Sequence, residues 1–133
     1  MRESPWFAMI AVAIGGAIGA VCRFGVGLLM ARWHGAAAPL GTLFVNLAGC
    51  FLIGALMPWL LRDSVPAIYR ALLVTGFCGG LTTFSTFGYE ALWLARSAGR
   101  SDLAWSYIFS NLILGLGAVW IGEQLALRYW GHD

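Results

Sequence analysis

The stretch Gly76-Phe77-Cys78-Gly79-Gly80-Leu81-Thr82-Thr83-Phe84-Ser85-Thr86-Phe87 decides how this chain folds. It lies within a long apolar segment, yet it contains three glycines and four hydroxyl residues. Glycine costs about 1 kcal/mol relative to alanine in a helix interior. At membrane depth, freed backbone polar groups are tolerated only where protein covers them or a polar path passes. We predict that Gly76–Thr82 breaks a membrane helix and that Thr83–Phe87 lines such a path.

The composition of the 133 residues indicates an integral membrane protein. Hydrophobic residues make up 60% of the chain, charged residues make up 11%, and the mean hydropathy is +0.79. A helix needs roughly 20 apolar residues to cross the hydrocarbon core. Four charge-free segments approach or exceed that length, at residues 4–22, 33–61, 71–89 and 103–122. We predict one all-α membrane domain over residues 1–133, with spans at about 7–30, 40–61, 67–98 and 103–127.

Polar side chains inside the predicted spans are the candidates for function, because a polar group at that depth needs a partner or water. Arg23 in the first span either anchors the helix end or faces a functional path. Asn46 in the second span either hydrogen-bonds a neighbouring helix or lines that path. In the third span, Thr83, Thr86 and Glu90 form a polar stripe at spacing i, i+3 and i+7.

Aromatic residues and a further polar patch accompany this stripe. Phe84 and Phe87 are three residues apart and share a helix face, either for packing or as part of a binding site. Tyr107, Ser110 and Asn111 form a polar patch near the start of the fourth span. The three cysteines lack any metal-ligand spacing, and we interpret them as small core residues.

The arginines predict an antiparallel assembly. The chain has no lysine, and an even number of spans puts both termini on one side. The arginines of that side are Arg2, Arg62, Arg70 and Arg128, and those of the other side are Arg32, Arg96 and Arg100. An asymmetry in positive charge normally sets the orientation, and here it is almost absent. Since four spans are poorly suited to enclosing a pore alone, we expect an antiparallel, dual-topology homodimer.

Three motifs occur in order along the first three spans. They are Gly19-Ala20-x-x-Arg23, Gly41-Thr42-Leu43-x-Val45-Asn46-x-x-Gly49-x-Phe51-x-x-Gly54, and the Gly76–Phe87 stretch. Together they resemble the Fluc (CrcB-type) fluoride channels, and the fourth span agrees in length and in Tyr107. The resemblance implies a passive fluoride-selective channel, not an enzyme, which lowers cytoplasmic fluoride. It also implies a multi-pass location in a bacterial plasma (inner) membrane.

The same resemblance implies site residues and a bound ion. Two antiparallel copies would form two pores, with a structural sodium ion (Na+) at the dimer centre held by backbone carbonyls of Gly79 and Thr82. The implied pore and fluoride residues are Arg23, Asn46, Thr83, Phe84, Ser85, Thr86, Phe87, Glu90, Tyr107 and Asn111. Gly115 stands where family members often carry a further hydroxyl, which leaves the lining role of Asn111 open.

Two other functions stay open at this point. A dual-topology, proton-coupled exporter of small cations needs a membrane carboxylate, for which Glu90 is the candidate. A non-transporting scaffold subunit would carry no flux. The sequence offers no nucleophile–base pair typical of an enzyme, and its net charge of +2 does not indicate a nucleic-acid partner. The expected partners are fluoride, the lipid bilayer and a second copy of the chain.

Overall fold

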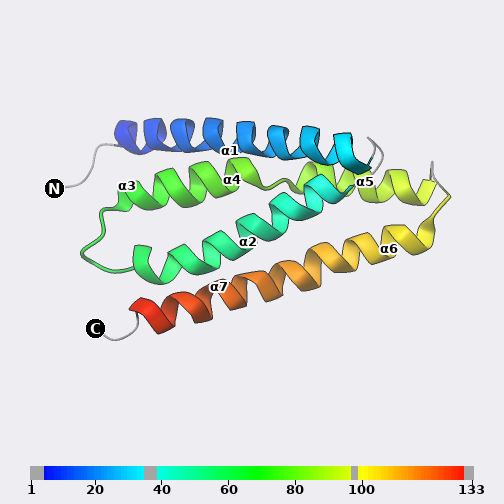
Figure 1. The fold of residues 1–133 in the computed structure, drawn as a ribbon. Coiled ribbons are helices and arrows are strands. Elements are labelled where there is room, and N and C mark those ends of the chain that lie inside the picture. The colour runs from blue at the N-terminus through cyan, green and yellow to red at the C-terminus, as the bar shows by residue number, and fades with distance from the viewer. Residues whose placement is uncertain (1–4, 35–38, 97–98, 131–133) are drawn as a thin grey trace.

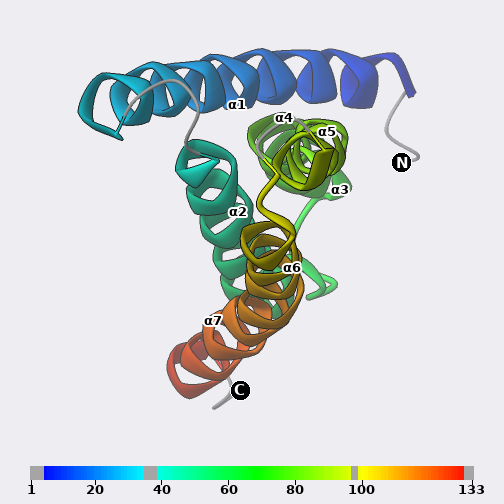
Figure 2. The same cartoon turned by 90° about the vertical axis from the view of Figure 1, so that its right-hand side faces the viewer.

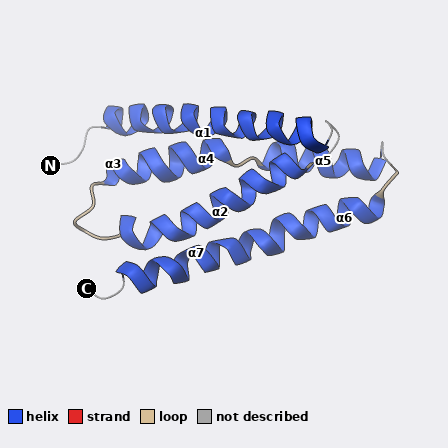
Figure 3. Cartoon of the chain, viewed as in Figure 1, coloured by secondary structure: helices blue, strands red, loops and turns tan. Residues whose placement is uncertain are grey.

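A computed structural model describes residues 5–34, 39–96 and 99–130, and every regular element within these ranges is helical (Figure 3). The elements are α1 (Pro5–His34), α2 (Leu40–Leu60), α3 (Ala67–Arg70), η1 (Ala71–Cys78), α4 (Gly79–Leu81), α5 (Phe84–Arg96), α6 (Ser101–Phe109), η2 (Ser110–Leu114) and α7 (Gly115–Trp130). The segments η1 and η2 are π-helical.

Four of the described segments are long and apolar enough to cross a membrane, at Pro5–Trp33, Leu40–Leu60, Ala67–Arg96 and Ser101–Tyr129. This confirms the prediction of an all-helical, multi-pass membrane protein. The first and fourth segments extend a few residues beyond the predicted spans at both ends. The predicted end of the third span, at residues 97–98, lies outside the described residues. The assignment of the chain to a single domain stays a prediction.

The helices form an open arrangement. The start of α1 and the end of α7 lie at the same end of the molecule (Figure 1). Viewed from the side, α1 crosses obliquely over the segment from α3 to α5, and α7 lies at the opposite edge of the arrangement beyond α2 (Figure 2). The most extensive contacts join α2 to α7 and α1 to η1.

Glycines allow α1 to approach η1 and α4 closely. A methyl group on Gly15 would overlap the Leu72 carbonyl oxygen, and one on Gly80 would overlap the Gly16 carbonyl oxygen. Such small-residue contacts let the backbones of membrane helices pack directly against each other. The small-residue stripe of the first span thus packs against protein.

A similar glycine contact joins α2 to α7. A methyl group on Gly54 would overlap the Val119 carbonyl oxygen, and one on Gly122 would overlap that of Phe51. The cysteines differ from the prediction of three core residues. Cys78 is buried, whereas Cys50 is half-buried and Cys22 is exposed.

The non-helical backbone of the third segment is shorter than the predicted break. The residues from Gly76 to Leu81 are helical, Thr82 has an extended backbone (φ −81°, ψ 159°), and α5 begins at Phe84. The early glycines remain helical because they pack against α1, where the adjoining backbone is covered. The extended backbone at Thr82 and the adjacent Thr83 separates α4 from α5.

Candidate functional site

Asn46 binds the backbone at the start of α5. Its Oδ1 accepts a hydrogen bond from the Thr83 N–H at 2.8 Å, and its Nδ2 donates to the Thr83 carbonyl at 3.3 Å. Nδ2 also donates to Oδ1 of Asn111 at 3.1 Å, and Asn111 Nδ2 donates to the Tyr107 carbonyl at 3.1 Å. These contacts join α2, the non-helical segment and η2.

The Thr83 hydroxyl caps α5. Thr83 Oγ1 accepts the Thr86 N–H at 3.2 Å, which is the bond that an N-cap hydroxyl makes to the third residue of a helix. The same hydroxyl donates to Thr86 Oγ1 at 3.1 Å and pairs with Ser85 Oγ at 3.2 Å. Thr83 is buried, whereas Ser85 and Thr86 are exposed in the single chain. The predicted hydroxyl track is thus a connected cluster at the first turn of α5.

Glu90 bridges two further helices. Its Oε1 accepts a hydrogen bond from Thr42 Oγ1 at 3.0 Å, and its Oε2 accepts one from the Tyr107 hydroxyl at 2.6 Å. Thr42 and Tyr107 are both buried. The carboxyl group therefore links α5 to α2 and α6, and each of its oxygens has a donor.

The two phenylalanines touch but differ in burial. Their ring centroids are 5.4 Å apart, and the Phe87 ring lies 5.5 Å from that of Tyr107. Phe87 is 8% exposed, whereas Phe84 is 79% exposed. The pair therefore has one ring in the protein core and one ring at the surface of the single chain.

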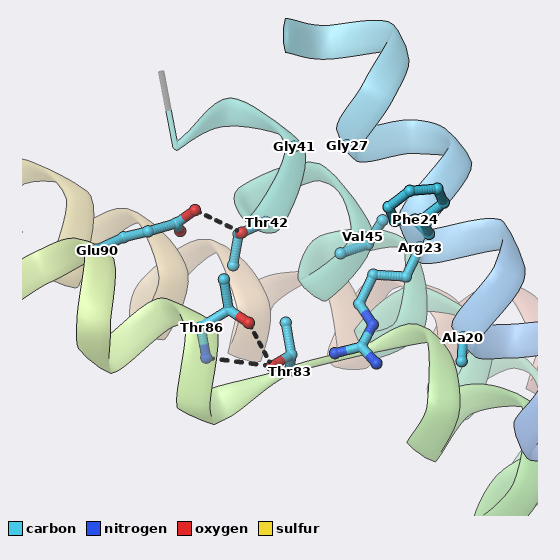
Figure 4. Close-up of a pocket in the computed structure, with 10 residues that line it drawn as sticks. All are labelled: Ala20, Arg23, Phe24, Gly27, Gly41, Thr42, Val45, Thr83, Thr86 and Glu90. Carbon is cyan, nitrogen blue, oxygen red and sulfur yellow. Dashed lines mark hydrogen bonds between the residues drawn. The ribbon is translucent and has the colours of Figure 1, made fainter. Parts of the chain in front are cut away.

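The first cavity, which we call the arginine cavity, has a volume of about 320 Å³ (Figure 4). It is lined by Ala20, Arg23, Phe24, Gly27, Gly41, Thr42, Val45, Thr83, Thr86 and Glu90. The Arg23 side chain extends from α1 toward Thr83 (Figure 4). Among the described residues, Arg23 has no hydrogen-bond or ion-pair partner. Its positive charge is thus available to an anion entering this cavity.

The second cavity, which we call the phenylalanine cavity, has a volume of about 230 Å³. It is lined by Asn46, Cys50, Thr82, Thr83, Phe84, Phe87, Asn111 and Leu112. Thr83 lines both cavities, so it lies between the two. Ser85 and Tyr107 line neither cavity and reach them through Thr83 and Glu90.

The carbonyl groups near the end of α4 suit a hard cation. The Thr83 N–H, which would bond the Gly79 carbonyl if the helix continued, donates instead to Asn46. Gly79 is exposed, and a methyl group there would meet only the Val74 carbonyl oxygen at 3.7 Å. The extended backbone of Thr82 turns its own carbonyl away from the helix path. Hard cations prefer such oxygen ligands.

Two of the lining residues that were not among the predicted site residues, Thr42 and Cys50, lie on the same helix as Asn46. Thr42 donates to Glu90, and it lies one helical turn before Asn46 on α2, a spacing that places both on the same face. Cys50 lines the phenylalanine cavity one turn after Asn46. The i, i+4 spacing from Asn46 was the signal that would have identified both.

Comparison with known families shows the family to which the chain belongs. Residues 10–123 match the family model described as "CrcB-like protein, Camphor Resistance (CrcB)". The chain belongs to the CrcB-like family. The match begins in α1 and ends in α7, so it includes every residue that lines either cavity.

Curated relatives of the CrcB-like chain share much of its sequence. A protein of Nitrobacter winogradskyi is 40% identical over 90% of this chain and 95% of its own length. One of Chloroflexus aurantiacus is 44% identical over 92% and 97%, and one of Azotobacter vinelandii is 48% identical over 85% and 91%. Each of these relatives is named "Fluoride-specific ion channel FluC".

Proposed function

We propose that this protein is a passive, fluoride-selective ion channel of the bacterial plasma (inner) membrane that lowers cytoplasmic fluoride. The observation that carries the proposal is the identity of 40–48% with relatives named fluoride-specific channels, over at least 85% of the chain. The two cavities support it, because the Arg23 guanidinium and hydroxyl, amide and phenyl groups line them in an otherwise apolar chain.

The lining groups suit a small, tightly hydrated anion. Lining hydroxyl groups and the Asn111 amide can replace water as hydrogen-bond donors, and phenyl rings are positive at their edges. An ion channel must bind strongly enough to admit the ion and weakly enough to release it. We assign the attraction of fluoride to Arg23. We assign the pathway to both cavities, including the residues that line them and the residues that hydrogen-bond to the lining. The pathway residues are Asn46, Thr83, Phe84, Ser85, Thr86, Phe87, Glu90, Tyr107 and Asn111.

The third span is, in this proposal, broken near the middle of the membrane. The extended backbone at Thr82 and its position between two helical segments of one apolar span support the break. We assign the carbonyl groups of Gly79 and Thr82 to a structural sodium ion at the centre of a dimer. Sodium would supply positive charge that holds two copies together. The Gly79 carbonyl lacks its helical partner, the Thr83 N–H, because that N–H donates to Asn46 instead.

The functional unit is, in this proposal, an antiparallel, dual-topology homodimer. Phe84 is 79% exposed in the single chain, and Ser85 and Thr86 are also exposed. Hydrocarbon cannot hydrogen-bond such hydroxyls, so a second protein copy is the better covering. The near balance of arginines between the two ends supports opposite orientations of the copies.

Efflux from liposomes tests the function. Purified protein is reconstituted into liposomes loaded with equal concentrations of fluoride and chloride, and both ions are followed with selective electrodes. The proposal expects rapid fluoride loss with chloride retained. Comparable loss of both ions, or no loss of either, would contradict it, and the second result would favour a scaffold subunit.

A further inference from the structure

Asn46 has no donor hydrogen left to offer an anion. A side-chain amide carries two donor hydrogens and one acceptor oxygen. Nδ2 of Asn46 donates to the Thr83 carbonyl at 3.3 Å and to Asn111 Oδ1 at 3.1 Å, and Oδ1 accepts from the Thr83 N–H at 2.8 Å. Because the Thr83 N–H can only donate, these partners also fix which atom of the Asn46 amide is oxygen.

The two bonds to Thr83 satisfy backbone groups that lie outside a helix. Thr83 is 7% exposed, and an unpaired backbone group in such a place is strongly unfavourable. Asn46 bonds both the N–H and the carbonyl of this one residue, so it fixes the position and the direction of the peptide groups around it.

The position of Thr83 in turn fixes the start of α5. Its hydroxyl caps the helix through the Thr86 N–H, and α5 carries Phe84, Phe87 and Glu90 within its first two turns. Thr86 and Glu90 line the arginine cavity, and both phenylalanines line the phenylalanine cavity. A shift of Thr83 would therefore move side chains of both cavities together.

We propose that Asn46 is a positioning residue for permeation. Through Thr83 it holds the start of α5, and with it the lining of both cavities, instead of donating a hydrogen bond to fluoride. This inference rests on the proposed function, because it concerns how that channel conducts.

Two substitutions of similar size separate positioning from direct donation. Asn46→Asp and Asn46→Leu both remove the amide donors, but Asp keeps an oxygen that accepts the Thr83 N–H. Hydrogen exchange of the Thr83 and Thr86 amides is measured by NMR on protein labelled with ¹⁵N-threonine. Exchange at both amides should accelerate about tenfold or more in Asn46→Leu, as expected for a lost hydrogen bond. It should stay within about threefold of wild type in Asn46→Asp. Unchanged exchange in Asn46→Leu would overturn the proposal.

Fluoride efflux from liposomes gives the functional half of the test. Positioning predicts that Asn46→Asp retains more flux than Asn46→Leu. Direct donation predicts the reverse order, because neither variant has the donor and a carboxylate also repels fluoride. Flux in Asn46→Asp equal to or below that in Asn46→Leu would overturn the proposal. Phe44→Leu, at a 55% exposed position of α2, is the control and should conduct like wild type.

The wild-type protein provides a test that does not depend on a variant folding. The chain has two asparagines, so ¹⁵N-asparagine labelling gives two side-chain amide signals. The Asn46 signal should not shift when fluoride is added, and a saturable shift would overturn the proposal. If the wild-type protein carries no fluoride flux, the proposed function fails, and the exchange rates alone decide whether Asn46 positions α5.

Discussion

The Phe84 ring is exposed, although it touches the buried ring of Phe87. Both rings line the phenylalanine cavity, and their positive edges are suited to an anion. Isoleucine has a similar apolar character but no ring edge. We therefore expect Phe84→Ile or Phe87→Ile to lower fluoride efflux from liposomes by about tenfold or more, which corresponds to about 1.4 kcal/mol of lost interaction.

The proposed dimer should stay intact in these phenylalanine variants, as judged by size-exclusion chromatography in detergent. Phe7→Ile is the matched control, because Phe7 is 64% exposed at the start of α1 and lines neither cavity. Wild-type flux in both Phe84→Ile and Phe87→Ile would remove the two rings from the pathway.

Glu90 distinguishes a channel from a proton-coupled exchanger. An exchanger needs a carboxyl group that takes up and releases a proton, whereas a channel needs Glu90 only to hold Thr42 and Tyr107. Glutamine keeps the size of the side chain and one acceptor oxygen. We expect Glu90→Gln to lower fluoride efflux by less than about tenfold, the effect of weakening one hydrogen bond. Complete loss of transport in a variant that stays folded and elutes like wild type would favour the exchanger.

At the residue scale, the sequence predicted which polar residues lie close together better than it predicted how they are connected. Arg23, Thr86 and Glu90 line one cavity, as their depth in apolar spans suggested. The two bonds from Asn46 to the backbone of Thr83 could not be read from sequence, because they join residues 37 positions apart. Such a contact depends on how α2 packs beside the non-helical segment, which local periodicity does not specify.

At the element scale, the contact between α1 and η1 depends on glycines that leave no room for a side chain. A methyl group on Gly19 would overlap the Phe77 carbonyl oxygen and approach the Leu81 nitrogen at 2.8 Å. Overpacking of this kind typically costs 1–3 kcal/mol, as an order of magnitude. We expect Gly19→Ala to lower the thermal unfolding temperature in detergent by several degrees.

Gly25→Ala is the matched control for this packing prediction. Gly25 lies on the same helix, and a methyl group there would meet nothing within 4 Å. Alanine favours a helix by about 1 kcal/mol over glycine, so this variant should be as stable as wild type or more stable. If the two variants unfold at the same temperature, the close contact between α1 and η1 does not contribute to stability as described.

The helices themselves were largely predictable, and their irregular segments were not. Runs of apolar residues between charges located all four spans, because the hydrocarbon core imposes a minimum length. The glycines at the start of the Gly76–Phe87 stretch were expected to be non-helical, but they remain helical and pack against α1. The π-helical segments η1 and η2 have no signal in hydropathy, since a change of hydrogen-bond register leaves the composition unchanged.

At the scale of the whole molecule, the single chain leaves its polar first turn of α5 uncovered. A second, antiparallel copy would cover it, which requires that the chain insert in both orientations. We expect a reporter fused to the C-terminus to be detected on both faces of the membrane. The positive-inside rule predicts such a distribution when arginines are nearly balanced. Detection on one face alone would contradict the dual-topology assembly.

In the proposed channel, fluoride moves through the protein passively and without a coupled ion. The most direct test is the reversal potential of the current through purified protein in a planar bilayer, under a fluoride gradient with chloride and pH varied separately. For a passive, fluoride-selective channel we expect reversal at the fluoride equilibrium potential, about 59 mV for a tenfold gradient, with no shift when chloride or pH is changed. A reversal potential that follows the chloride or proton gradient would contradict it.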